Sequence, residues 1–170
     1  RYVAIVLRIN SPGGAVAPSQ EMYDAVRRLG QKKPVVASLG SVAASGGYYV
    51  AVAGNEILAE PATLTGSIGI FALKPDFAPL LARLGIHQEV LLRGERADLF
   101  SVTRRWTPEE TAQVQRVIGE FYEQFVAKVA DGRRLDRARV EEIARGQIWS
   151  GLQAREIGLV DRIGGLPEAI

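Results

Sequence analysis

Uninterrupted apolar runs in the sequence predict a set of short, buried β-strands. The runs Tyr2–Ile9 and Pro34–Leu39 are almost wholly apolar, as in strands that are covered on both faces. Three shorter runs, Glu56–Ala59, Ser67–Phe71 and His87–Leu92, also have strand character. We therefore expect a sheet whose strands are mostly buried.

Helical spacing separates these apolar runs. Apolar residues recur every three or four positions through Met22 and Val26, and Gly30 ends the pattern. The strongest local signal is Thr107–Glu110, where Thr is the N-cap, Pro takes the first helical position and Glu completes a capping box. A long apolar stripe follows as far as Val129. Further helices are predicted over residues 48–52, 76–84, 137–144 and 151–157.

Strands that alternate with helices predict an α/β fold built on a mainly parallel sheet. No internal repeat, low-complexity tract or linker interrupts the sequence, so we expect a single domain over residues 1–170. The chain begins inside an apolar strand pattern at Arg1 and ends on a first helical turn over residues 166–170. We expect a fragment of a longer protein, truncated at its N-terminal end and also at its C-terminal end.

Composition restricts the chemistry more than the fold. With 21 Lys and Arg against 19 Asp and Glu, the formal net charge is +2, and no basic run favours a nucleic-acid partner. The absence of cysteine excludes disulfides and thiol nucleophiles, and a single histidine, His87, excludes a multi-histidine metal site. No apolar run approaches the ~18 residues of a membrane span, and no signal-peptide pattern opens the chain. We expect neither a metal nor a cofactor.

Ser45 is the candidate nucleophile. Ala43, Ala44, Gly46 and Gly47 surround it with almost no side-chain bulk, after a strand and before a predicted helix. A serine nucleophile needs an exposed Oγ at a sharp strand-to-helix turn and room for a substrate carbonyl, and small neighbours provide both. The same small residues equally suit close packing of a helix on a sheet, so both interpretations stay open.

Two further features bear on this chemistry. Gly13 and Gly14 follow the first strand, where bare amides can stabilise an oxyanion, although taken alone they are better explained by an ordinary Pro-Gly turn. A base is harder to find. His87 is read as an ordinary residue at the start of a strand. None of the four lysines, Lys32, Lys33, Lys74 and Lys128, has an obviously buried setting that would make its amine neutral.

Three motifs, in order and at a similar spacing, resemble those of the signal peptide peptidase A (protease IV) family of serine proteases. They are Asn10–Gly14, Gly40–Tyr49 and Thr65–Gly69, and the likeness continues through Trp106–Glu110 and Gly146–Asp161. The resemblance implies a crotonase/ClpP-like α/β fold and peptide hydrolysis by a Ser–Lys dyad. It covers nearly the whole chain.

Carried over by position, the resemblance assigns four catalytic roles. Ser45 matches the nucleophile and Gly14 an oxyanion-hole glycine, while the amide of Gly46 is a second donor. Ser67 matches the hydroxyl that orients the lysine amine, although by itself it would be read as a hydroxyl that caps the end of a strand. Tyr48, Tyr49 and Leu64 are expected either to line substrate pockets or to pack in the core.

The general base departs from the family's pattern. Short members place the lysine in Gly-x-x-Lys-Asp, whereas the matching stretch here is Gly94–Asp98, with Ala97 at the lysine position. Either this chain is the serine-bearing half of a long tandem form, which we favour, or Ala97 replaces a lysine in a short form. Arg93 and Arg96 stay protonated and do not serve as bases.

The resemblance also implies the setting of the enzyme. We expect extended, apolar peptides such as cleaved signal peptides as substrates, lying along Gly13 and the 66–70 segment. A lysine-bearing repeat or subunit would complete the dyad, so this chain alone should be inactive or incomplete. The expected state is a homo-oligomer at the cell membrane of a bacterium or archaeon, with the catalytic domain on the extracytoplasmic side.

Two other functions remain as alternatives. A crotonase-type acyl-CoA enzyme shares the implied fold but needs carboxylates at the site, for which only Glu60 and Asp98 are candidates. A non-catalytic assembly half is suggested by Ala97 and by the apolar stripe of the long helix.

Overall fold

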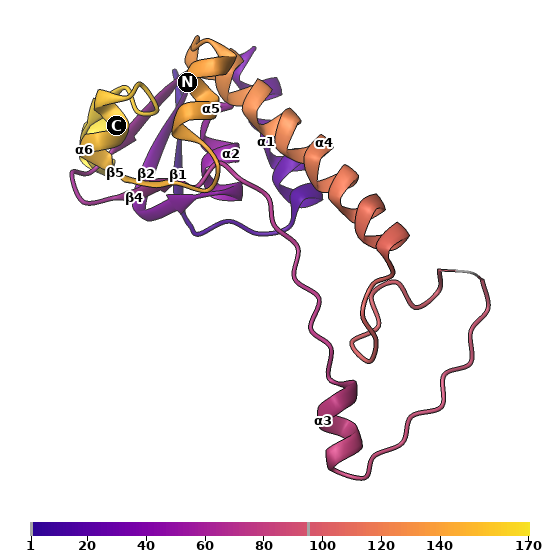
Figure 1. The fold of residues 1–170 in the computed structure, drawn as a ribbon. Coiled ribbons are helices and arrows are strands. Elements are labelled where there is room, and N and C mark those ends of the chain that lie inside the picture. Colours follow the sequence, from indigo (N-terminus) through magenta and orange to yellow (C-terminus); the bar gives the residue numbers. More distant parts are fainter. Residues whose placement is uncertain (1, 95) are drawn as a thin grey trace. The chain divides into compact units, whose positions relative to one another are not determined.

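The computed structural model describes residues 2–94 and 96–170, and the chain divides into two compact units. The first unit contains the chain up to Ile70 and again from Phe121 to Ile170, and the second is Phe71–Glu120 (Figure 1). The expectation of a single domain over the whole chain stays a prediction.

A six-stranded sheet is the centre of the first unit. Its strands are β1 (Ile5–Ser11), β2 (Val35–Ala44), β3 (Glu56–Ala59), β4 (Leu64–Gly66), β5 (Ile148–Ser150) and β6 (Arg162–Ile163). The order is β5-β4-β2-β3-β6, and β1 also pairs with β2. Every pair is parallel except β4 with β5. The predicted α/β fold with a mainly parallel sheet is confirmed.

The described residues contain seven helices. Those that lie wholly in the first unit are α1 (Val16–Gly30), α2 (Gly46–Ala51), α5 (Arg137–Ile143), α6 (Gly151–Glu156) and α7 (Leu166–Ala169). The second unit contains α3 (Ala78–Arg83). The longest helix, α4 (Pro108–Arg133), begins in the second unit and ends in the first. None of the described helices is long and apolar enough to cross a membrane.

The hydrophobic core of the first unit lies between the sheet and its helices. Leu39 of β2 and Ile57 of β3 are fully buried, as are Phe125 and Val129 on the C-terminal half of α4. Tyr48 of α2 is also completely buried, and its hydroxyl donates to the Leu159 carbonyl at 2.7 Å. Burial raises the pKa of this phenol, so Tyr48 stays a neutral donor in the core.

Long-range pairing changed several predicted strands. The second predicted strand, which was expected to end at Leu39, continues to Ala44 because β1 and β4 both pair with its last residues. The predicted strand Ser67–Phe71 is wrong: β4 ends at Gly66, whose φ of +78°, followed by +49° at Ser67, turns the chain out of the ladder. Strands β5 and β6, which are only three and two residues long, were not predicted.

The strand predicted over His87–Leu92 is also wrong. This stretch lies in neither a helix nor a strand in the structure, and it makes no backbone hydrogen bond with any described residue. Its sequence has strand character, but nothing in the described part of the chain pairs with it.

Candidate active site

Ser45 lies at the turn between β2 and α2, with φ 50° and ψ −120°. A residue other than glycine rarely adopts a positive φ, and such strain gathers at functional sites. The backbone is fixed on both sides, since the Ser45 amide donates to the Gly66 carbonyl at 2.9 Å and the Ser45 carbonyl accepts from the Tyr49 amide at 2.8 Å. The hydroxyl makes no hydrogen bond with any residue in 2–94 or 96–170, so Oγ is free to react.

The small residues around Ser45 allow the 11–14 loop to lie directly against it. A Cβ on Gly13 would come within 2.7 Å of Ser45 Cβ and 2.9 Å of the Gly46 amide nitrogen. A Cβ on Gly47 would come within 2.6 Å of the Ser11 carbonyl oxygen. Close packing, one of the two interpretations of the sequence, is therefore present at this turn, and Ser45 itself is half-buried.

The backbone of Gly14 lies against that of Gly46, the residue that follows Ser45. A Cβ on Gly46 would be 3.2 Å from the Gly14 amide nitrogen and 2.5 Å from Ser19 Oγ. Neither amide donates a hydrogen bond to any residue that the structure describes. Two unused donors beside a serine hydroxyl are the arrangement that an oxyanion hole requires.

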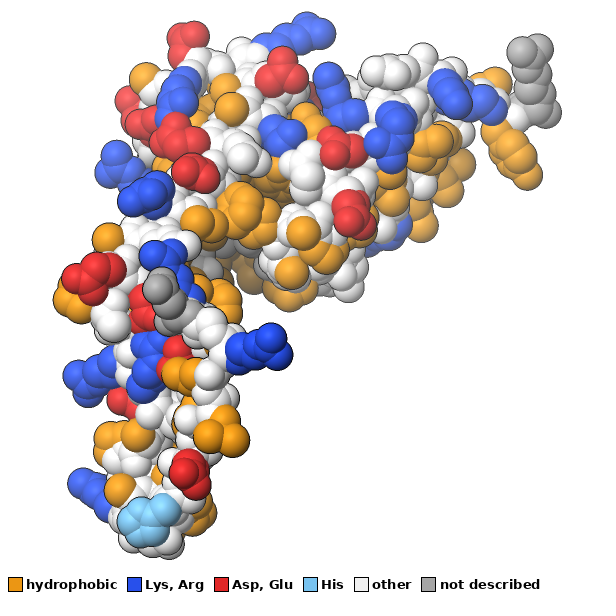
Figure 2. Space-filling view, turned by 90° about the vertical axis from the view of Figure 1, so that its right-hand side faces the viewer, with side chains coloured by type: hydrophobic (Ala, Val, Ile, Leu, Met, Phe, Trp, Pro, Cys, Tyr) orange, Lys and Arg blue, Asp and Glu red, His pale blue; other side chains and the backbone are white. Residues whose placement is uncertain are grey.

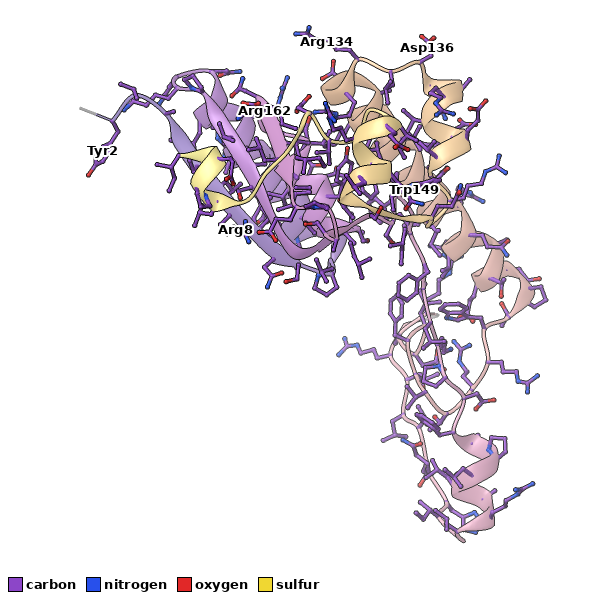
Figure 3. All side chains as sticks on the ribbon, turned by 90° about the vertical axis from the view of Figure 1, so that its left-hand side faces the viewer. Tyr2, Arg8, Arg134, Asp136, Trp149 and Arg162 are labelled. Atoms are coloured by element: carbon purple, nitrogen blue, oxygen red, sulfur yellow. The ribbon has the colours of Figure 1, made fainter. Side chains whose placement is uncertain are left out.

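Ser67 is brought close to Ser45 by the pairing of β4 with β2. Gly66 is the register partner of Ala44, so the residues that follow them, Ser67 and Ser45, leave the sheet together. The Ser67 amide donates to the Gln147 carbonyl at 2.7 Å, which fixes its backbone at a φ of +49°. The Trp149 ring of β5 packs against Gly66, where a Cβ would lie 2.8 Å from the ring. Trp149 is labelled in Figure 3.

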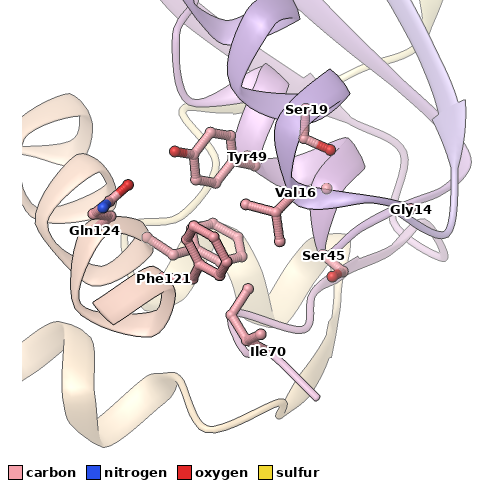
Figure 4. A pocket seen from close by; sticks show the side chains of 10 residues that line it. Gly14, Val16, Ser19, Ser45, Tyr49, Ile70, Phe121 and Gln124 are labelled. Carbon is pink, nitrogen blue, oxygen red and sulfur yellow. The ribbon is translucent and has the colours of Figure 1, made fainter. Parts of the chain in front are cut away.

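An apolar pocket opens beside Ser45 (Figure 4). Tyr49 forms one wall, its ring 4.8 Å from that of Phe125 and its hydroxyl bonded to the Gln20 side chain. Burial raises the pKa of Tyr49 to about 12, so this wall is uncharged at neutral pH. Of the three residues expected in a pocket or the core, Tyr49 lines this pocket, Tyr48 is in the core and Leu64 is half exposed. The pocket is otherwise lined by Gly14, Val16, Ser19, Gly46, Ile70, Phe121 and Gln124.

No lysine of the first unit lines the pocket that contains Ser45. Lys33 Nζ donates to the Tyr2 carbonyl at 2.7 Å, and Lys128 Nζ lies 4.1 Å from the centre of the Tyr23 ring. In the second unit, Lys74 has a buried amine, although its setting in the sequence is not obviously buried. Its Nζ is inaccessible to solvent, lies 5.5 Å from the centre of the Trp106 ring and has no hydrogen-bond partner among the described residues.

Ala97 is exposed in the second unit, and the next residue, Asp98, is fixed by hydrogen bonds. Arg104 donates to both oxygens of Asp98 at 2.5 and 2.7 Å, and to both oxygens of Glu110 at 2.7 and 2.6 Å. The hydrogen bonds from Arg104 hold the pKa of Asp98 below its usual range. Asp98 is therefore occupied by Arg104, while Glu60 faces solvent with Arg8 3.9 Å away. Glu60 does not line the pocket that contains Ser45.

Glu110 completes the predicted capping box of α4 and titrates at unusually low pH. Its carboxylate accepts from the Thr107 amide at 2.9 Å, and its own amide donates to Thr107 Oγ1 at 3.2 Å. The hydrogen bonds from Arg104 and then that from Thr107 lower the pKa of Glu110 from 4.5 to about 2. A carboxyl group whose pKa is lower in the folded state than in the unfolded state stabilises the fold at pH values above its unfolded-state pKa.

We therefore expect stability to fall as the pH drops from about 4.5 to about 2, where Glu110 takes up a proton in the folded state. The Glu110→Gln variant should be less stable at neutral pH and should lose less stability across this window. Urea unfolding followed by circular dichroism at a series of pH values measures both effects. The exposed Glu120→Gln variant is the matched control, and equal pH slopes for the two variants would contradict the assignment.

Sequence comparison places these features in a known family. The family model described as peptidase family S49 matches residues 27–170. The chain belongs to peptidase family S49. The resemblance to signal peptide peptidase A (protease IV) is confirmed, and the α/β architecture is the ClpP/crotonase-like fold of the S49 peptidases.

Relatives in peptidase family S49 align over nearly the whole chain. A relative from Synechocystis sp. is 43% identical over 96% of this chain, which spans 59% of that protein. "Serine protease SPPA, chloroplastic" of Arabidopsis thaliana is 40% identical over 100% of the chain, and "Protease 4" of Salmonella typhi is 41% identical over 98%. The chain spans 25% and 27% of the lengths of these two proteins.

Proposed function

We propose that this chain is the serine-bearing part of an endopeptidase that hydrolyses extended, apolar peptides such as cleaved signal peptides. The observation that carries the proposal is Ser45 itself: a strained turn presents a free hydroxyl beside two unused amides, those of Gly14 and Gly46. Membership of peptidase family S49 supports the class of reaction.

In the proposed mechanism, Ser45 Oγ attacks the scissile carbonyl carbon while a neutral lysine amine accepts the hydroxyl proton. The Gly14 and Gly46 amides donate to the oxyanion of the tetrahedral intermediate. The protonated lysine then gives its proton to the leaving amine, and an acyl-enzyme ester forms on Ser45. Water, activated by the same lysine, hydrolyses this ester and regenerates the serine.

The lysine comes from outside this chain, in a repeat or subunit that carries Gly-x-x-Lys where this chain has Ala97. Arginine does not replace it, because a guanidinium stays protonated. The proposed role of Ser67 is to orient the incoming amine through its hydroxyl. Its fixed backbone, one residue beyond the carbonyl that holds the Ser45 amide, supports this role.

The pocket beside Ser45 supports an apolar substrate residue. Val16, Ile70, Phe121 and Phe125 offer hydrocarbon, and the neutral phenol of Tyr49 closes one side. The peptide backbone would lie along Gly13 and the 66–70 segment.

A fluorophosphonate probe tests the proposal, because it reacts only with an activated serine. We expect labelling at Ser45, located by peptide mass spectrometry, when the chain is part of a polypeptide that also carries the Gly-x-x-Lys repeat. Labelling of the 170-residue chain alone should be about 10²-fold slower or more, since it lacks the base. Equal labelling of a Ser45→Ala variant would refute the nucleophile. Rapid labelling of the isolated Ala97→Lys chain would instead assign the base to this chain.

A further inference from the structure

The pocket beside Ser45 is small as well as apolar. Its free volume is about 20 Å³, whereas roughly 10–15 Å³ is enough to hold one water molecule. A single methyl group fits into this space, but the branched side chain of leucine does not. The pocket therefore selects a substrate side chain by its size and not only by its lack of polarity.

The lining of the pocket identifies the substrate residue that enters it. Ser45, Gly14 and Gly46 all contribute to the lining. In the proposed mechanism, the attacked carbonyl carbon bonds to Ser45 Oγ, and its oxygen accepts from the two glycine amides. The side chain nearest to these three residues is the one on the same substrate residue as that carbonyl. The pocket therefore receives the side chain of the residue before the cleaved bond, an assignment that rests on the proposed function.

Two walls of the pocket belong to the hydrophobic core and are rigid. Tyr49 is 6% exposed and Phe125 is 1% exposed, and their rings meet edge to face with centres 4.8 Å apart. The Tyr49 hydroxyl donates to the side chain of Gln20, which does not line the pocket, so the ring is fixed from behind. Ile70 also packs against the core. These side chains do not move aside for a larger substrate residue.

Phe121 is the largest lining side chain outside the core. It lies on α4 one turn before Phe125, is half-buried, and does not belong to the core cluster. Figure 4 shows its ring among the side chains that gather beside Ser45. Exposed apolar side chains are common on this protein (Figure 2), so the place of Phe121 in the pocket, and not its partial exposure, gives it a role.

We infer that Phe121 is the specificity-determining residue of this site. Its ring closes the pocket to side chains larger than a methyl group, so the protein cleaves much faster after alanine than after leucine. A hydrophobic pocket discriminates by roughly 10–200-fold between side chains that differ by one methylene, and leucine exceeds alanine by more than that.

Two fluorogenic peptides that differ only in the residue before the cleaved bond, alanine or leucine, test the inference. The enzyme is the polypeptide that contains both this chain and the Gly-x-x-Lys repeat. We expect kcat/KM of the natural protein to be at least roughly ten-fold higher for the alanine peptide. In the Phe121→Ala variant the vacated space accepts leucine, so the ratio of the two kcat/KM values should shift by roughly 100-fold towards the leucine peptide.

Two further variants accompany this measurement. Phe121→Leu keeps an apolar side chain on the helix, and its ratio should lie between those of the natural protein and of Phe121→Ala. Val117 is 41% exposed, lies one turn earlier on α4 and does not line the pocket, so Val117→Ala should keep the natural ratio. A general loss of stability would lower both rates together and leave the ratio unchanged.

The possible results distinguish the size limit from the peptidase reaction itself. Equal hydrolysis of the two peptides by the natural protein would overturn the size limit alone. The same ratio in the natural protein and in both Phe121 variants would overturn the role of Phe121 alone. If the natural protein hydrolysed neither peptide and a fluorophosphonate did not label Ser45, the proposed function would be refuted, and the inference with it.

Discussion

Replacing Ser45 by alanine is expected to lower peptide hydrolysis by the lysine-complemented protein about 10⁴-fold or more. The nucleophile acts as a unit with its base, so its loss prevents formation of the acyl-enzyme entirely. Only the oxyanion donors and substrate binding then contribute to catalysis. The fold should survive, because the fixed points of this turn are the Ser45 amide and carbonyl, which alanine retains. Stability changes should be small for the same reason. Steady-state hydrolysis of an apolar fluorogenic peptide measures the effect.

Ser41→Ala is the matched control for this experiment. Ser41 is an exposed serine on β2, the strand that leads to Ser45, and lies four positions before it, so the Ser41→Ala variant should retain full activity. Comparable losses in the two variants would show that the effect comes from the strand and not from the hydroxyl. Full activity of Ser45→Ala would place the nucleophile elsewhere.

Replacing Gly13 by alanine is expected to disrupt both the fold of the loop and the reaction. At a φ of +113° an L-residue is strained, and its Cβ would lie 2.7 Å from Ser45 Cβ and 2.9 Å from the Gly46 nitrogen. Both contacts are with rigid parts of the turn, so the loop must move away and take the Gly14 amide with it. We expect a loss of about 2–4 kcal/mol in the free energy of unfolding. Fluorophosphonate labelling should fall about 10²–10³-fold, as for the loss of an oxyanion donor.

The Gly146→Ala variant separates the effect of backbone strain from the effect of a steric clash at the new Cβ. Gly146 has a φ of +77°, but nothing lies within 4 Å of the position of its Cβ. This variant should show only the backbone strain, about 1–2 kcal/mol, and should retain its labelling rate. Urea unfolding and labelling kinetics of both variants give the comparison. If Gly13→Ala labelled as fast as the natural chain, the Gly14 amide would have no part in the oxyanion hole.

The elements predicted correctly are those that local sequence determines. The capping box at Thr107 and Glu110 formed as expected because its hydrogen bonds join residues only three positions apart. The strand Glu56–Ala59 has the predicted bounds. Predictions failed where a distant partner decides the outcome. Ser67–Phe71 left the sheet at a positive-φ turn, and His87–Leu92 found no partner among the described residues.

The candidate site followed the same division. Ser45 was singled out because small residues after a strand are a local pattern, whereas the roles of Gly14 and Gly46 came from the family resemblance, and all three assignments stay predictions. Apart from Tyr49, the lining of the pocket was missed, because residues such as Ile70 and Phe121 are far apart in the sequence and meet only in the folded first unit. The buried Lys74 amine was missed as well, since nothing near it in the sequence shows that Trp106 lies 5.5 Å away.

The sequence by itself determined the α/β class, the candidate nucleophile, its small neighbours and the lack of a lysine at position 97. Each depends on residue type and on spacing over a few positions, which periodicity and side-chain chemistry fix directly. Only the tertiary structure decided that β2 runs on to Ala44, that Ser45 takes a strained turn, and that the Gly14 and Gly46 amides lie together. These features depend on hydrogen bonds and close contacts between segments that are remote in the chain, and no local preference specifies them.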